Sequence, residues 1–333
     1  MIAEIRAVAQ RAYRFDNARE RHRALVFMVR AVLHWNLFRT LYDFFQETAQ
    51  RRALYQRNPY PLEQATRAFF YAGSTMRARV ALICAHYAYL EKRLSERDFI
   101  ALGYDTPYVI WRSAEPDMDW HAYLKFESGQ RKEGLLTVMM DVGEAHLYQI
   151  IFWIEQREDA GALVIGAMQG PNTEDAQDFI REMTKRAHRF RTKNLILYMT
   201  QAVARALGVQ RIFAVSNAGY YANNHMRRDR KLKTDFGVFW EEVGGQVTED
   251  ARFYELPLVL ARKTMEEVPT RKRALYRRRF DFLDAVDAEI ARRMGEILKP
   301  CPSPPRRFSA GTWTSSRTTS VVLDRRMPIL SSS

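Results

Sequence analysis

The sequence predicts an α+β fold in which an N-terminal helical region, residues 1–115, precedes a mixed sheet flanked by helices, residues 116–298. The first observation is that apolar residues recur every three or four positions up to about residue 94, which is typical of amphipathic helices. The second is that, from residue 120, the pattern changes to short β-branched and aromatic runs between turn residues, which is typical of strands. Residues 299–333 fit neither pattern.

Two helical patterns make up the first region. One extends over residues 24–45 and a second over residues 62–94, with the proline-containing segment 58–61 between them. The apolar side chains of the second pattern form one stripe, which indicates packing against a core. His86 lies in that stripe among apolar neighbours, so we expect a core histidine and not a metal ligand.

The second region begins with four strands that predict an antiparallel meander, because short turns join each strand to the next. They cover residues 120–126, 134–142, 146–154 and 161–168. The Gly-Pro-Asn segment at 170–172 ends this meander, since none of these residue types favours a continuing strand.

Three helices and two strands are expected in the rest of the second region. The helix expected over residues 172–188 has acidic residues in its first turn and basic residues in its last, as the helix dipole favours. The helix expected over residues 194–207 is apolar nearly all round, which indicates burial, and Gly208 stands where a left-handed C-cap would end it. The remaining elements are expected to be strands over residues 211–215 and 253–260 and a closing helix over residues 275–298.

The composition argues against several classes of protein. Two cysteines, Cys84 and Cys301, are too few for a disulfide framework or a cysteine-based metal site, and no other spacing predicts a metal site. The first residues lack the pattern of a secretory signal, and no run approaches the roughly 20 apolar residues of a membrane span. We therefore expect a reducing, cytoplasmic location, either in solution or at the inner face of the membrane. The Ser-, Pro- and Arg-rich tail over residues 299–333 predicts disorder.

The formal charge of +13 is concentrated in the second half of the chain. Residues 181–193 hold six basic residues and one acidic residue, residues 226–233 hold five and one, and residues 262–279 hold eight and two. The tail adds a further excess of arginine, so the rest of the chain is net acidic. Clusters of this kind favour a phosphate-bearing ligand or an acidic partner over nucleic acid, because no nucleic-acid-binding motif accompanies them.

The cluster at 181–193 has a position that favours anion binding. It comes just before the N-terminus of the buried helix expected at 194–207, where free N–H groups and the helix dipole already favour negative charge. Cationic side chains at that end are unfavourable for the helix itself, and a bound anion would compensate them. We predict that this cluster binds a cofactor phosphate, through Lys185, His188, Arg189, Arg191 and Lys193.

Three polar residues further along the chain are candidate catalytic groups. Asn217 follows the buried strand at 211–215, where α/β folds bind ligands, although a turn-forming asparagine explains it equally well. Asp235 and Glu241 lie on either side of an aromatic pair, so one of them would act as a general base if its pKa were raised. The simpler interpretation of both carboxylates is the solvated edge of a helix.

The order of two strands, basic loop, buried helix and strand ending in asparagine resembles the core of the GNAT acyltransferase superfamily. The residues that carry this resemblance are 194–209 and 212–217. It implies that the loop before the helix holds the pyrophosphate of coenzyme A, that the acceptor lies where two central strands separate, and that Tyr220 protonates the leaving thiolate. The loop at 186–191 lacks the two glycines usual in that superfamily, which favours an acyl carrier protein with its phosphopantetheine over free acyl-CoA.

Several spaced motifs, between residues 20 and 298, are similar to those of the VirK/YbjX family of Gram-negative bacteria. They include His86-Tyr87, Glu133-Gly134-Leu135-Leu136-Thr137, the segment 165–170, Val215-Ser216-Asn217, the segment 235–245 and the segment 272–279. Tyr220 stands where the family usually has a histidine, with His225 as a candidate substitute. The resemblance implies a role in virulence, envelope stress or resistance to cationic antimicrobial peptides, and it implies no particular reaction.

Three classes of function follow from these observations. The first is an acyltransferase that transfers an acyl group from acyl-CoA or acyl carrier protein to an amine or a hydroxyl. The alternative is a non-enzymatic stress-response factor that binds a protein or an anionic membrane through the basic clusters at 226–233 and 262–279. Nucleic-acid binding by the same clusters ranks last.

Overall fold

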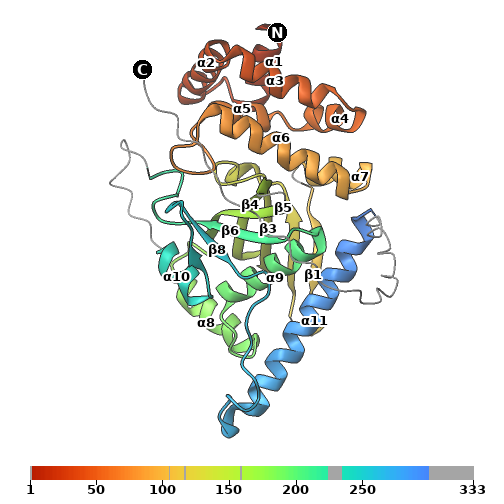
Figure 1. Ribbon diagram of the computed structural model, residues 1–333, viewed down its shortest axis with the longest axis vertical. Coiled ribbons are helices and arrows are strands. Elements are labelled where there is room, and N and C mark those ends of the chain that lie inside the picture. The colour runs from red at the N-terminus through yellow and green to blue at the C-terminus, as the bar shows by residue number, and fades with distance from the viewer. Residues whose placement is uncertain (1, 105, 116–117, 158–159, 224–234, 300–333) are drawn as a thin grey trace, which may run out of the picture. The chain divides into compact units, whose positions relative to one another are not determined.

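A mixed sheet lies beneath a layer of N-terminal helices in the computed structural model, as Figure 1 shows. The structure describes residues 2–104, 106–115, 118–157, 160–223 and 235–299. The basic cluster at 226–233, His225 and the predicted disordered tail from residue 300 onward lie outside the described residues. Up to Lys299 the chain forms one compact unit, and its mixture of helices and sheet confirms the α+β fold class.

Seven helices precede the first strand among the described residues. They are α1 (Ile2–Ala12), α2 (Ala18–Leu33), α3 (Trp35–Gln46), α4 (Ala49–Arg57), α5 (Tyr60–Thr66), α6 (Met76–Arg93) and α7 (Glu96–Leu102). The helix expected over 24–45 is broken at His34, where α2 and α3 meet at 97°. The helix expected over 62–94 is two helices, because Phe70 and Gly73 adopt positive φ between α5 and α6. Apolar spacing continues across both breaks, so periodicity alone does not reveal them.

None of the described helices is by itself both long enough and apolar enough to cross a membrane. Helices α2 and α3 meet that test only as a pair, and the bend of 97° separates them. The inner sides of both helices are packed in the core, where Phe27 and Phe38 are almost completely buried.

The sheet has eight strands among the described residues, in the order β1-β2-β3-β4-β5-β6-β8-β7. Their bounds are β1 (Tyr108–Arg112), β2 (Trp120–Lys125), β3 (Leu136–Val142), β4 (Ala145–Arg157), β5 (Ala160–Gln169), β6 (Arg211–Val215), β7 (Gln246–Val247) and β8 (Phe253–Leu256). Strands β2 to β5 form the antiparallel meander that the sequence predicts. Strand β1 extends its edge, although it lies in the region expected to be helical. Strand β6 pairs in parallel with β5 and antiparallel with β8, which makes the sheet mixed.

In the part of the chain that the structure describes, four α-helices follow the meander: α8 (Ala176–Arg186), α9 (Thr192–Leu207), α10 (Phe236–Glu242) and α11 (Arg273–Ile297). Helix α9 is buried along most of its length and packs on β3 and β4, while α11 packs on α9 and β1. Helix α9 ends at Gly208, whose φ of 77° confirms the predicted left-handed C-cap. Strand β4 is buried on both faces, because α6 packs on it as well as α9.

His86 on α6 joins that helix to β4. The Ile154 N–H donates a hydrogen bond of 3.0 Å to its Nδ1, and the side chain is completely buried. Burial lowers the pKa of His86 to about 3, so the ring is neutral at physiological pH. The expectation of a core histidine is confirmed.

Strand β5 contains a β-bulge at Gly166. Phe152 of β4 pairs with Ile165, whereas Ile151 pairs with Ala167, so Gly166 is the extra residue. The parallel pairing with β6 ends at the same point, since its last pair joins Ile165 to Ala214. From Gly166 to Gln169, therefore, β5 continues without a strand beside it on the β6 side, within the described part of the chain.

The main chain that leads into β3 crosses this bulge at very short range. A Cβ atom at Gly166 would lie 1.8 Å from the carbonyl oxygen of Glu133. One at Gly134 would lie 2.7 Å from the carbonyl oxygen of Phe152. The crossing is secured by the Leu135 N–H, which donates 2.9 Å to the Phe152 carbonyl. Because only glycine fits at both positions, the two glycines fix the place of Glu133 over the bulge.

We predict that Gly166→Ala lowers the free energy of unfolding by about 3 kcal/mol or more, because the added methyl group meets main chain that cannot move away. The matched control is Gly295→Ala in α11, where a Cβ has no neighbour within 4 Å. That change should raise stability by up to about 1 kcal/mol through helix propensity. Urea unfolding of both variants measures the difference, and a Gly166→Ala protein as stable as the wild type would contradict the close crossing.

Candidate functional site

A pocket of about 650 Å³ opens at the carboxyl ends of β5 and β6, where the two parallel strands cease to pair. It is lined by Tyr148, Ala167, Met168, Gln169, Gly170, Pro171, Asn172, Ile180, Lys193, Tyr220 and Phe236. The end of β5 and the following turn form one wall, and helices α8, α9 and α10 each contribute one residue. Ligands of open α/β sheets bind beyond the carboxyl ends of their strands, so this pocket is the candidate functional site.

Tyr220 connects this pocket to a buried carboxylate. Its hydroxyl donates a hydrogen bond of 3.3 Å to Oε1 of Glu133, whose side chain is only 4% exposed. The second oxygen of Glu133, Oε2, is buried and accepts no hydrogen bond from the residues that the structure describes. Burial is the main cause that raises the pKa of Glu133 to about 7. A carboxyl group of this kind exchanges protons near neutral pH, as a catalytic acid or base must.

The phenol of Tyr220 stays protonated at physiological pH. Burial raises its pKa above the usual range, and the neighbouring charge of Glu133 raises it further. Because the raised pKa makes the phenol a weak acid, it can pass its proton to a group in the pocket only if it takes another proton from the protonated carboxyl group of Glu133.

The turn after β6 holds Tyr220 in place. The Oγ of Ser216 accepts 3.0 Å from the Gly219 N–H and donates 2.8 Å to the Ala251 carbonyl. Tyr220 also forms an antiparallel bridge with Tyr71. The Ser-Asn pair at the end of the strand is therefore part of a turn that aims Tyr220 into the pocket.

Asn217 and Asp235 contact one another next to the pocket, and both accept hydrogen bonds from main-chain N–H groups at the start of α10. The Asn217 Nδ2 donates 2.7 Å to Oδ1 of Asp235, while its own Oδ1 accepts 2.8 Å from the Phe236 N–H. Asp235 caps the helix by accepting 3.2 Å from the Val238 N–H. The hydrogen bond from Asn217 lowers the pKa of Asp235, the opposite of what the general-base interpretation needs. The pair thus positions Phe236, which lines the pocket.

Glu241 lies on the exposed side of α10. It accepts a hydrogen bond of 3.0 Å from the Tyr254 hydroxyl and does not line the pocket. Of the four predicted catalytic residues, only Tyr220 therefore faces the cavity, with Asn217 and Asp235 supporting its rim.

The five predicted phosphate-binding residues do not converge on one point. Lys185 is exposed on α8 and pairs with Glu182 at 3.3 Å. Arg191 and Lys193 lie at the N-terminus of α9, and both pair with Glu242, Lys193 at 3.6 Å. Lys193 lines the pocket, and burial together with the charge of Arg191 lowers its pKa.

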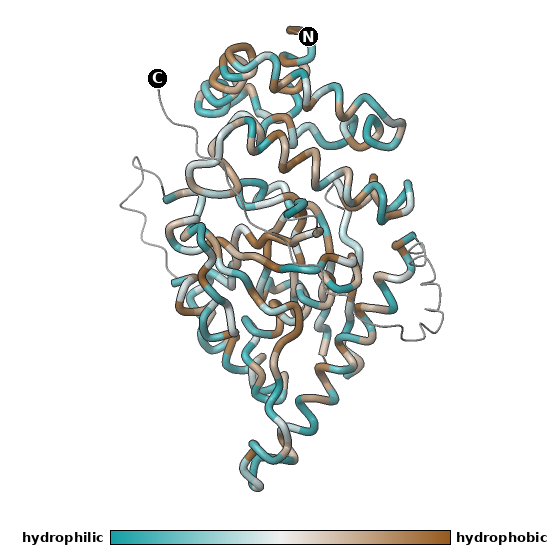
Figure 2. Tube along the Cα trace, viewed as in Figure 1, coloured by the Kyte–Doolittle hydropathy of each residue, from teal (hydrophilic) through white to brown (hydrophobic). Residues whose placement is uncertain are grey.

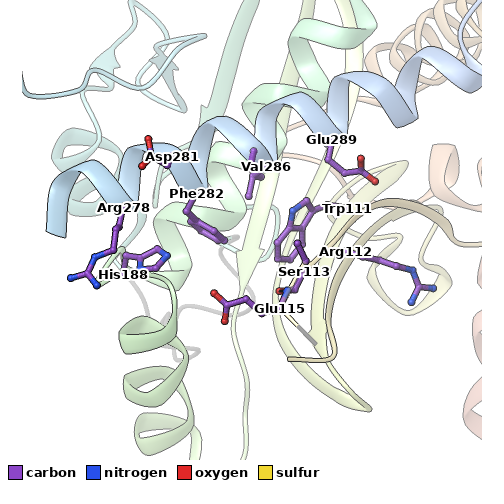
Figure 3. Close-up of a pocket in the computed structure, with 12 residues that line it drawn as sticks. Trp111, Arg112, Ser113, Glu115, His188, Arg278, Asp281, Phe282, Val286 and Glu289 are labelled. Carbon is purple, nitrogen blue, oxygen red and sulfur yellow. Dashed lines mark hydrogen bonds between the residues drawn. The ribbon is translucent and has the colours of Figure 1, made fainter. Parts of the chain in front are cut away.

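His188 lines a different cavity, and Arg189 follows it on the surface. Both adopt left-handed backbone conformations, with φ of 51° and 60°, and their carbonyl oxygens accept hydrogen bonds of 3.1 Å from Arg279 of α11. The ring of His188 packs on Phe282 in a cavity of about 580 Å³ between α11 and the end of β1. Figure 3 shows His188 beside Arg278 at one end of this cavity. It shares no lining residue with the pocket at β5 and β6.

Sequence reasoning did not single out Glu133, Tyr148 or Gln169 as site residues. The contact of Glu133 with Tyr220 joins residues 87 positions apart, so no local pattern contains it. The available signal is Gly166 in the middle of a buried strand run, because such a glycine often marks a bulge or a close approach of main chain. No group of three or more His, Cys, Asp or Glu side chains could hold a metal ion in the part of the chain that the structure describes.

Residues 16–292 match a family described as "Protein of unknown function (DUF535)". The chain belongs to the DUF535 family. It is 32% identical over 211 residues to the uncharacterized protein YbjX of Escherichia coli (strain K12). The matched segment covers 62% of this chain and 63% of YbjX. An uncharacterized protein of Haemophilus influenzae is 22% identical over 221 residues, covering 65% of this chain and 70% of that protein. These matches confirm the VirK/YbjX resemblance. No solved structure matches the chain.

We predict that Glu133→Gln makes the free energy of unfolding less dependent on pH. A folded-state pKa of about 7, above the unfolded value near 4.5, means that protonation stabilises the fold fully below pH 4.5. This stabilisation is lost as the pH rises through about 7. Between pH 5 and 8.5 the wild type should therefore lose up to about 3 kcal/mol relative to the variant.

Urea unfolding at the two pH values measures this difference. The control is Glu144→Gln, which neutralises an exposed glutamate and should leave the pH profile unchanged. Identical pH profiles for the wild type and Glu133→Gln would show that the carboxyl group of Glu133 titrates normally.

Proposed function

We propose that this protein is an acyltransferase whose donor, an acyl carrier protein or acyl-CoA, inserts its phosphopantetheine arm into the pocket at the ends of β5 and β6. The observation that carries the proposal is the end of parallel pairing at the Gly166 bulge, directly beside the pocket. Beyond that point no strand of the described residues lies on the β6 side of β5, so its peptide groups can pair with the amides of an extended arm. The GNAT-like order of elements supports the same placement.

Tyr220 and Glu133 would carry out the proton transfer to the leaving group in this reaction. An amine or hydroxyl of the acceptor attacks the thioester carbonyl, a C–N or C–O bond forms, and the C–S bond breaks. Tyr220 gives its proton to the leaving thiolate and regains one from Glu133. The proton that the acceptor loses passes to water, and Glu133 takes one back from water before the next turnover, so no net proton is consumed.

Cationic residues around the pocket would receive the charged part of the donor. Lys193 lies at the pocket itself, while Lys185, Arg189 and Arg191 lie on the surface around α8 and the start of α9. Exposed cations suit the acidic surface of an acyl carrier protein better than they suit a single bound pyrophosphate, because they are spread out. A cytoplasmic location and a role in envelope stress, virulence or antimicrobial-peptide resistance belong to this proposal. The location is expected from the composition of the chain, and the role is implied by the family resemblance.

A second candidate function is a non-enzymatic stress-response factor that binds an acidic protein. The observation that favours it is the exposure of Lys263, Arg271, Lys272, Arg277 and Arg278 around the start of α11. Surfaces of this kind accelerate association with acidic partners without any chemistry.

Donor binding and thiol release distinguish these functions. We predict that the wild type binds acyl-carrier protein or acyl-CoA and releases free thiol with hydroxylamine as a small acceptor. Tyr220→Phe and Glu133→Gln should each reduce the rate by roughly 10²-fold, the usual contribution of a proton-transfer group, with little change in donor affinity. The matched control is Tyr108→Phe, which removes a hydroxyl that bonds to the Arg293 carbonyl, away from the pocket.

Two results would contradict the proposal. One is that neither donor binds to the wild type. The other is that Tyr220→Phe and Glu133→Gln release thiol as fast as Tyr108→Phe does. Binding of an acidic protein without any thiol release would favour the second candidate function.

A further inference from the structure

The outer face of α2 is apolar where a solvent-facing helix is normally polar. Leu25, Val29, Val32 and Leu33 are 55%, 49%, 52% and 72% exposed. Their spacing places them on one side of the helix, opposite Phe27, which is 1% exposed. The hydropathy colouring of Figure 2 shows hydrophobic segments in α2 beside hydrophilic ones. A contiguous exposed aliphatic stripe of this kind marks an interaction surface.

The stripe can lie on a lipid surface but cannot cross it. Helices α2 and α3 are the one pair among the described helices whose combined length and composition satisfy the membrane test. Their bend of 97° and the burial of their inner sides leave only the outer face available. An amphipathic helix in this situation lies in the plane of the interface with its apolar side chains among the acyl chains.

Arginines border the stripe and determine which lipid it suits. Arg19 and Arg21 are exposed on opposite sides of its N-terminal end, by the rotation of 100° per helical residue. The one acidic residue of α2, Glu20, pairs with Arg23. In the first 33 residues seven arginines stand against three acidic residues. Arginine side chains reach lipid phosphates from such positions, so anionic headgroups match this border.

We propose that α2 docks the protein on an anionic membrane surface, with Leu25, Val29, Val32 and Leu33 in the acyl region and Arg19 and Arg21 at the phosphates. The stripe is only one helix face wide. A stable dimer buries about 800 Å² on each partner, which needs a broader surface, so lipid fits the stripe better than a second copy of the chain does. The surface is separate from the pocket at β5 and β6, and the inference does not depend on acyl transfer.

Co-sedimentation of the full chain with vesicles tests this assignment, using phosphatidylcholine alone and a 3:1 mixture with phosphatidylglycerol. The wild type should partition on the mixed vesicles at least about 10-fold more strongly. The variant Leu25→Ser/Val29→Ser/Val32→Ser/Leu33→Ser should lose this binding, and the milder Val29→Glu should weaken it. The matched control is Val238→Ser/Val259→Ser, which removes exposed valines elsewhere, 64% and 62% exposed, and should bind as the wild type does.

The charge border has its own test. Arg19→Glu/Arg21→Glu should remove the preference for phosphatidylglycerol, and thermal unfolding should show that each variant remains folded. Equal binding of the wild type to both vesicles, or equal binding of the wild type and the serine variant, would overturn the proposal. So would a wild-type dimer in light scattering that the serine variant converts to a monomer, if no vesicle binding accompanies it.

Discussion

The close crossing of the Glu133 main chain over the bulge at Gly166 is the constraint on which the rest of the site depends. The bulge shifts the register of β5, and parallel pairing with β6 ends at the adjacent residue. The same crossing carries the side chain of Glu133 into a buried position against Tyr220. The close main-chain contact, the end of strand pairing, the pocket and the buried carboxyl group with its raised pKa thus lie next to one another in the fold.

Local sequence patterns predicted those elements whose structure is determined by residues close to one another in the sequence. The antiparallel meander and the Gly208 cap of α9 are of this kind, because alternation and glycine placement act over a few positions. The break at His34 and strand β1 were not predicted, since apolar spacing continues through the first and an edge strand depends on its partner β2. In the site, Tyr220 was predicted and Glu133 was not, because their contact spans 87 positions and exists only in the fold.

The cationic side chains that give the sequence its positive charge lie in several separate places and have different contacts. Arg191 and Lys193 are compensated by Glu242, and a left-handed turn directs His188 to another cavity. Asp235, which the sequence offered as a base, caps a helix with a lowered pKa. Net charge therefore overstates the cations available to one ligand. The exposed cations at the start of α11 and along α2 instead form surfaces on different elements, suited to extended anionic partners.

A crystal structure with a non-hydrolysable acyl-pantetheine thioether analogue would show whether the end of β5–β6 pairing creates a site for a phosphopantetheine arm. We expect density for the analogue along residues 166–169 of β5, with the thioether near the Tyr220 hydroxyl. An analogue that binds only in the cavity lined by His188 and Phe282, or that does not bind at millimolar concentration, would contradict it.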